Sequence, residues 1–201
     1  MAIYLVRHGK AAAGSEHLDP GLDETGRQQA QLMAGALRSR RIGRLVVSPM
    51  LRCRETMAPL ADVLAMEPEV RDEVSEVFDP SMPADDRRMM IGPFMQSTWG
   101  AQSHDLRAWR RRCVEAVLDM GGEAADAGQD LVIVSHYIAI CTVIGKAMND
   151  DRVVPVPVAN ASISSVELVD GGFHLLSAGA TAHLPPGLVT GVNTAILGRG
   201  P

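Results

Sequence analysis

The sequence is poor in aromatic residues and has no strong excess of charge. Phe, Trp and Tyr make up only 3% of its 201 residues, and its net charge is −5 at pH 7. A chain with few rings and no net positive charge is poorly suited to stacking bases or to attracting nucleic acid or an acidic membrane surface. We therefore expect neither partner, and an anionic ligand would have to be captured by a local group of cations.

Cysteines and long hydrophobic runs are also scarce. The chain holds three cysteines, Cys53, Cys113 and Cys141. Since they form neither a CxxC pair nor a disulfide framework, we expect reduced core thiols in a cytoplasmic protein. The start of the sequence has no basic segment followed by a long apolar segment, so we expect no signal peptide. The longest apolar stretch, Leu131–Gly145, is interrupted by Ser135 and His136 and is too short to span a bilayer.

Apolar runs typical of buried strands alternate with segments of helical periodicity. Strands are predicted at 2–6, 44–47 and 131–135, with a short strand near Val70 and a hairpin at 162–178. Helices are predicted from Asp23 to about 37, from 51 to 60, from 106 to 120 and from about 136 to 148. Asp23 and Ser48 are the predicted N-caps, with Pro49 in the first turn after Ser48.

This alternation predicts an α/β fold with three α/β/α layers, a mainly parallel central sheet and a closing hairpin. Residues 1–184 are expected to form one domain. A small inserted cap is expected at about 79–107, where prolines and glycines interrupt the periodicity. Residues 185–201 form a tail containing glycine and proline, to which we assign no role.

Polar side chains follow three of the predicted strands at their carboxyl ends. Arg7 and His8 follow the first strand, Arg52 lies shortly after the second, and His136 follows the third. Because ligands bind beyond the carboxyl ends of parallel strands, we expect these four side chains to converge on one pocket.

Two arginines and two histidines suit a phosphoryl group. The planar fork of Arg matches phosphate oxygens, and Arg52 is expected in the first turn of a helix, where free N–H groups favour an anion. With Arg7, Arg52 and His136 around the phosphoryl group, His8 would face the phosphorus as a nucleophile. The neighbouring arginines should keep His8 unprotonated. A nearby carboxyl group would be needed to protonate the leaving oxygen.

The stretches "VRHG", "SPMLRCRET", "EVSEVF" and "VSH" resemble the histidine phosphatase, or phosphoglycerate mutase-like, superfamily from about Ile3 to Leu184. The resemblance implies that His8 is the phosphoryl-accepting nucleophile. It places Arg7, Arg52 and His136 in the phosphate pocket, His136 also counting as catalytic. Glu76 is implied as the proton donor, with Glu73 as the fallback. Members of this family usually need no metal, so we expect no metal and no cofactor.

Four positions depart from the pattern of the family. Lys10 and Gly14 stand where mutases usually have other residues, which favours a phosphatase over a mutase. Tyr137 and Asp79 stand where glycine is common, which leaves open a module that binds a phosphate or a phosphoprotein without catalysis. We therefore predict a phosphate monoester hydrolase acting through a phosphohistidine. The substrate, a small molecule or a phosphoprotein, and the oligomeric state stay open.

Overall fold

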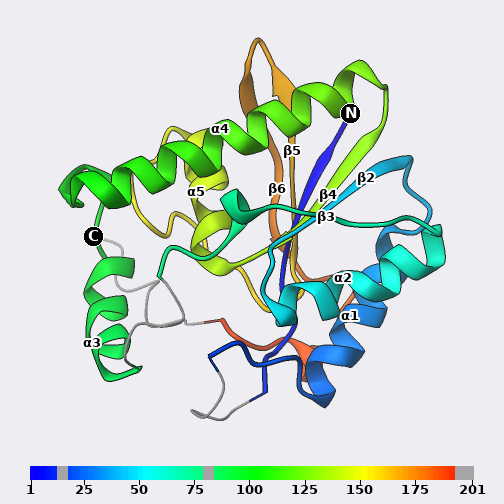
Figure 1. Ribbon diagram of the computed structural model, residues 1–201, viewed down its shortest axis with the longest axis horizontal. Helices are drawn as coiled ribbons and strands as arrows, with labels where there is room; N and C mark the ends of the chain where they lie inside the picture. The colour runs from blue at the N-terminus through cyan, green and yellow to red at the C-terminus, as the bar shows by residue number, and fades with distance from the viewer. Residues whose placement is uncertain (13–17, 79–83, 193–201) are drawn as a thin grey trace.

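The computed structural model describes residues 1–12, 18–78 and 84–192, with no side-chain description for 84–88. Within these residues, one sheet has the strand order β3-β2-β4-β1-β5-β6 (Figure 1). Its strands are β1 (Ile3–Arg7), β2 (Ile42–Val47), β3 (Glu69–Val70), β4 (Asp130–Ser135), β5 (Ile163–Val169) and β6 (Gly172–Ala180). The first four strands are parallel to one another, and the β5–β6 hairpin adds to β1 with β5 antiparallel to it. The predicted sheet, mainly parallel with a closing hairpin, is confirmed.

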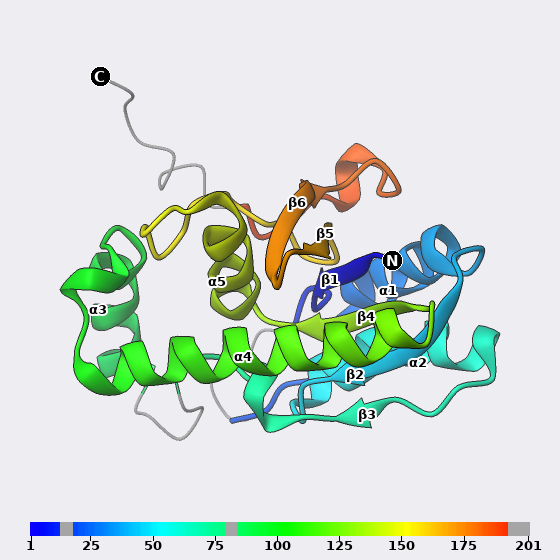
Figure 2. The ribbon, with the colours of Figure 1, turned by 90° about the horizontal axis from the view of Figure 1, so that it is seen from above.

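Helices cover both faces of this sheet (Figure 2). The helices are α1 (Glu24–Leu37), α2 (Leu51–Leu64), α3 (Ala84–Met95), α4 (His104–Asp126) and α5 (Tyr137–Met148). Helices α1 and α2 pack on one face, and α4 and α5 pack on the other. The expected three-layer α/β/α architecture is therefore confirmed.

The central strand β4 lies between the two helix layers, and its apolar residues are buried on both faces of the sheet. Leu131 and Ile133 belong to the core beneath α4 and α5. Val132 and Val134, on the opposite side of the strand, belong to the core beneath α1 and α2. Because both faces are buried, the strand needs no polar alternation.

The starts of the first two helices differ in how they are capped. Asp23 caps α1 as predicted, accepting a hydrogen bond from Gly26 N at 2.7 Å. The prediction that Ser48 caps α2 is wrong, because that helix begins at Leu51 after Met50, whose side chain makes no capping bond. Ser48 is instead buried against a histidine, as described below.

The expected cap at 79–107 is more regular than its sequence indicates. It contains α3 and a short 3₁₀-helix (Trp99–Ala101), and α4 already begins at His104; residues 79–83 lie outside the described residues. The ring of Phe94, at the end of α3, lies 5.7 Å from that of Trp99, and both side chains are buried. This aromatic contact packs the inserted segment against the core. It stabilises a regular structure there that the sequence periodicity did not predict.

Two further expectations concern the cysteines and the apolar runs. All three cysteines are buried and unpaired, as predicted. Among the described helices, none is long and apolar enough to cross a membrane.

Candidate active site

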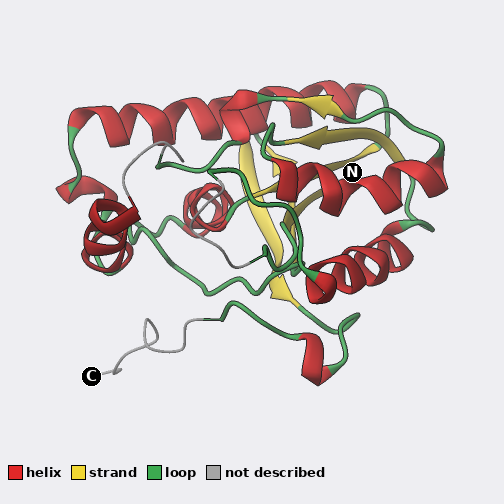
Figure 3. Cartoon of the chain, turned by 60° about the horizontal axis from the view of Figure 1, so that its bottom comes forward, coloured by secondary structure: helices red, strands yellow, loops and turns green. Residues whose placement is uncertain are grey.

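Parallel pairing brings three strand ends to one edge of the sheet. Arg7 at the end of β1 is in register with Ser135 at the end of β4, and His8 N donates to Ser135 O at 2.9 Å. Ser48, just beyond β2, donates its N–H to Val134 O at 3.1 Å. Figure 3 turns this end of the sheet toward the viewer. The residues that follow β1, β2 and β4 therefore lie at one edge of the sheet.

His8 is held so that one ring nitrogen stays available. Its Nδ1 lies 2.8 Å from Gly9 O, and because a carbonyl can only accept, Nδ1 carries the hydrogen and Nε2 keeps its lone pair. Burial, reinforced by the charges of Arg7 and Arg52, lowers the pKa of His8 to about 3. The ring is therefore neutral at physiological pH, which is the state that a nucleophile needs.

The glycine after His8 is required by a close approach to α1. A Cβ at Gly9 would lie 2.7 Å from Gly26 O. The Gly9 N–H also donates to Thr56 Oγ1 on α2 at 2.9 Å. The loop carrying His8 is thus pressed against two helices, and only glycine fits there.

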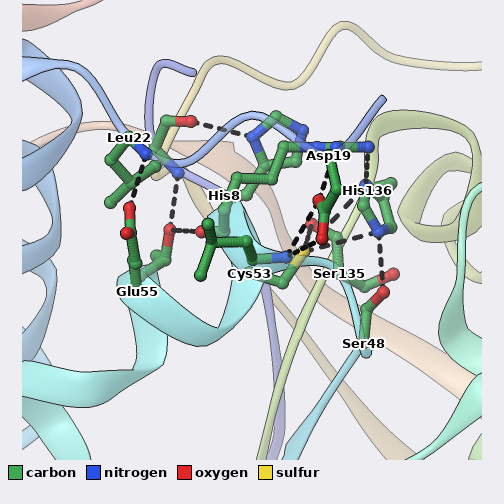
Figure 4. A network of polar contacts seen from close by, with 12 residues as sticks. His8, Asp19, Leu22, Ser48, Cys53, Glu55, Ser135 and His136 are labelled. Atoms are coloured by element: carbon green, nitrogen blue, oxygen red, sulfur yellow. Dashed lines mark hydrogen bonds and ion pairs between the residues drawn. The ribbon is translucent and has the colours of Figure 1, made fainter. Parts of the chain in front are cut away.

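His136 lies beside His8 and also contacts Ser48, just beyond β2, and Arg52, on α2 (Figure 4). The two ring centroids are 5.2 Å apart at an interplanar angle of 63°. His136 Nδ1 lies 3.2 Å from Arg52 Nη2, and its Nε2 lies 2.8 Å from Ser48 Oγ. A guanidinium can only donate, so Nδ1 accepts and Nε2 donates to Ser48. Burial, together with the charges around it, lowers the pKa of His136 well below its usual value.

Arg52 is the second residue of α2 and is oriented by a residue that the sequence did not single out. Asp19 Oδ1 lies 3.6 Å from Arg52 Nη1. The same carboxylate accepts the Leu51 N–H at 2.9 and 3.0 Å, so Asp19 caps α2 from a distant loop. No local spacing links Asp19 to α2, which is why sequence analysis missed it.

Arg7 is fixed by neutral groups. Its Nη1 donates to Val158 O and to Gly191 O, both at 2.8 Å, and its guanidinium carbon lies 4.8 Å from the centroid of the Tyr137 ring. Across the described part of the chain, Arg7 makes no ion pair. Its Nε is buried and has no hydrogen-bond partner there either. Arg7 thus keeps its positive charge for an anionic ligand.

The two candidate acids occupy different environments. The Glu73 carboxylate is bonded to Arg71 at 2.9 and 3.2 Å, and this contact lowers its pKa. The Glu76 carboxylate accepts from Val77 N at 2.9 Å and from Ile138 N, at the start of α5, at 3.4 Å. Burial outweighs these bonds and raises the pKa of Glu76. Of the two carboxyl groups, only that of Glu76 therefore keeps its proton to a higher pH than an ordinary glutamate does.

A C-terminal segment, which sequence analysis left without a role, reaches this site. Besides the Arg7 contact with Gly191 O, Thr190 O accepts from Asn160 N at 2.9 Å, and Asn160 Nδ2 donates to His8 O at 3.1 Å. The fully buried Gln29 donates to Thr190 Oγ1 at 2.9 Å. Thr190 and Gly191 are thus connected by hydrogen bonds to Arg7 and to Asn160, which holds the loop that carries His8.

The set of donors at this site suits an anion. In the portion of the chain that is described, no three His, Cys, Asp or Glu side chains are grouped as a metal ion would require. Two guanidinium groups, a free imidazole nitrogen and a protonatable carboxyl together match a phosphoryl group and its transfer.

Known proteins resemble this chain in part of its sequence or in its fold. A probable phosphatase of Schizosaccharomyces pombe is 40% identical over 75 residues, which are 35% of this chain and 34% of that protein. The chain therefore spans about a third of the length of that curated relative. The structure of YhfR from Bacillus stearothermophilus is similar with a TM-score of 0.76 and 20% identity, over 92% of this chain and 99% of that one.

A phosphoserine phosphatase from Entamoeba histolytica, solved with 3-phosphoglyceric acid, has the same fold. Its TM-score is 0.72 at 20% identity, again over 92% of this chain and 99% of that one. The sequence also matches the profile of the histidine phosphatase superfamily (branch 1) over residues 3–181. This match covers most of the chain and every site residue considered above except Gly191 and its neighbours. The chain therefore belongs to branch 1 of the histidine phosphatase superfamily.

Proposed function

We propose that this protein hydrolyses small phosphate monoesters through a phosphohistidine formed on His8. The observation that carries the proposal is the His8 ring, which is neutral, fixed through Nδ1, packed against His136 and subject to the charges of Arg7 and Arg52. The Entamoeba phosphatase, solved with a small phosphorylated acid, supports a small substrate over a phosphoprotein.

In the first step the lone pair of His8 Nε2 forms a bond to phosphorus while the bond from phosphorus to the ester oxygen breaks. Because His8 Nδ1–H stays bonded to Gly9 O, the positive charge that develops on the ring is stabilised by a carbonyl dipole. The leaving oxygen takes the proton of Glu76, whose raised pKa keeps it available.

The phosphoryl oxygens carry the charge of the transition state. Arg7 supplies a guanidinium that no carboxylate of the described residues pairs with, and Arg52 adds a second guanidinium beside His136. Donors that are fixed before the substrate arrives need not reorganise during the reaction, which is the largest source of stabilisation in such transfers.

In the second step water attacks the phosphohistidine. The Glu76 carboxylate takes a proton from that water, the bond from phosphorus to Nε2 breaks, and the lone pair returns to His8. The products are the alcohol and inorganic phosphate, and Glu76 ends protonated as it began. One carboxyl therefore serves as acid and then as base.

Replacing His8 by Ala tests the proposal. His8→Ala should abolish turnover of p-nitrophenyl phosphate while the variant stays folded, and retained turnover would rule the mechanism out. Wild-type protein that binds phosphate in calorimetry but releases none from a panel of phosphorylated metabolites would instead indicate a binding module. Transfer of the phosphoryl group to a second phosphoglycerate, rather than its release, would indicate a mutase.

A further inference from the structure

We propose that Tyr137 is a positioning residue that holds Arg7 in place through the face of its ring, so that the guanidinium stays fixed without being neutralised. The expected effect on phosphate affinity rests on the proposed function. The contact between Tyr137 and Arg7 does not depend on that function.

The site treats its two arginines differently. Arg52 has a carboxylate partner, with Asp19 Oδ1 at 3.6 Å. Among the described residues Arg7 has no carboxylate at ion-pair distance, although Glu76 is near enough to act on its charge, and it contacts two carbonyl oxygens and the Tyr137 ring. A carboxylate beside Arg7 would also immobilise it, but it would cancel the positive charge that a dianionic phosphoryl group needs. A ring face attracts the cation while adding no net charge.

Burial makes this contact stronger than it would be on a surface. Tyr137 is only 7% exposed and Arg7 is half-buried, so less water screens the pair than on an open surface. Burial also raises the pKa of the Tyr137 phenol to about 12, so the hydroxyl stays neutral and contributes no opposing charge.

The position of Tyr137 follows from the fold. It is the first residue of α5, directly after His136, and Arg7 is in register with Ser135 across the β1–β4 pair. The two carbonyls on Nη1 fix one end of the guanidinium, and the ring supports its plane. Nε is buried and has no hydrogen-bond partner in the described residues.

The test compares three variants of the full chain. Tyr137→Leu should weaken binding of inorganic phosphate, measured by calorimetry, by about 5- to 30-fold. Its kcat/KM for p-nitrophenyl phosphate should fall with it. Tyr137→Phe keeps the ring and should restore both values to within about twofold. Tyr4→Leu, which removes another tyrosine facing an arginine, Arg40 at 5.8 Å, is the matched control and should leave phosphate affinity unchanged.

A purely structural role would give a different pattern. Loss of folded protein lowers the apparent kcat but leaves the affinity of the folded fraction unaltered. Unchanged phosphate affinity in Tyr137→Leu, or an equal loss in Tyr137→Phe, would overturn the inference. If Tyr137→Leu does not fold, Tyr137→Met takes its place.

A double-mutant cycle on stability separates this inference from the proposed function. Urea unfolding of Arg7→Met, Tyr137→Leu and the double variant should reveal a favourable coupling between the two side chains whether or not the protein binds phosphate. Additive losses would refute the contact. Wild-type protein that neither binds nor releases phosphate would refute the proposed function and leave a measured coupling standing.

Discussion

The low pKa of His8 predicts that the folded protein loses stability on mild acidification. The folded state resists protonation of His8 down to about pH 3, whereas the unfolded chain binds that proton near pH 6.5. The unfolded state therefore holds more protons throughout this window, and stability falls as pH falls through it.

The size of the effect follows from one proton. Each pH unit inside the window costs about 1.4 kcal/mol, so lowering the pH from about 6.5 to about 5 should remove about 2 kcal/mol through His8 alone. Above pH 6.5 this contribution is complete and constant. The neighbouring His136 titrates in the same direction, while the raised pKa of Glu76 acts with the opposite sign.

Urea unfolding at a series of pH values isolates the His8 term by difference. His8→Asn should flatten the slope of unfolding free energy against pH by about one proton between pH 6.5 and 5. His174→Asn, which removes an exposed histidine near the β5–β6 turn, is the control for the loss of a histidine as such, and His8→Asn should change the slope more than it does. Equal slopes in wild-type and His8→Asn proteins would refute a His8 that stays neutral in the folded state.

Two further predictions concern the acid and the C-terminal segment. Glu76→Gln should lower kcat about 10²- to 10⁴-fold for esters with poor leaving groups and much less for p-nitrophenyl phosphate. It should also remove the fall of kcat/KM as pH rises through the raised pKa of Glu76; an unchanged profile would exclude it as the acid. Gly191→Ala should destabilise the protein by about 1–3 kcal/mol and weaken phosphate binding, because Gly191 has φ +72° and its Cβ would lie 2.1 Å from Asn160 Oδ1. A fully active, equally stable variant would show that the segment does not support Arg7.

The sequence predicted the site residues that lie at the ends of strands with a clear apolar pattern. Arg7 ends β1, and His8 and His136 directly follow β1 and β4, two strands that are buried on both faces. Parallel pairing then brings the three residues together. Asp23 was predictable as a cap because its partner, Gly26, lies only three residues away.

What could not be predicted depends on contacts between distant segments. Asp19 reaches Leu51 from 32 residues away, and Gly191 reaches Arg7 from 184 residues away. Neither leaves a periodicity or spacing in the sequence. Ser48 has the composition of a helix cap, but the buried His136 ring competes for its hydroxyl, so tertiary packing overrides the local preference.

The most direct measurement of the central claim is rapid-quench trapping with a radiolabelled phosphate monoester. The account predicts a burst of label bound to the protein, stable in base and labile in acid, mapping to the peptide that contains His8 and missing from His8→Ala. Turnover with no covalent label, or label that persists in His8→Ala, would contradict it.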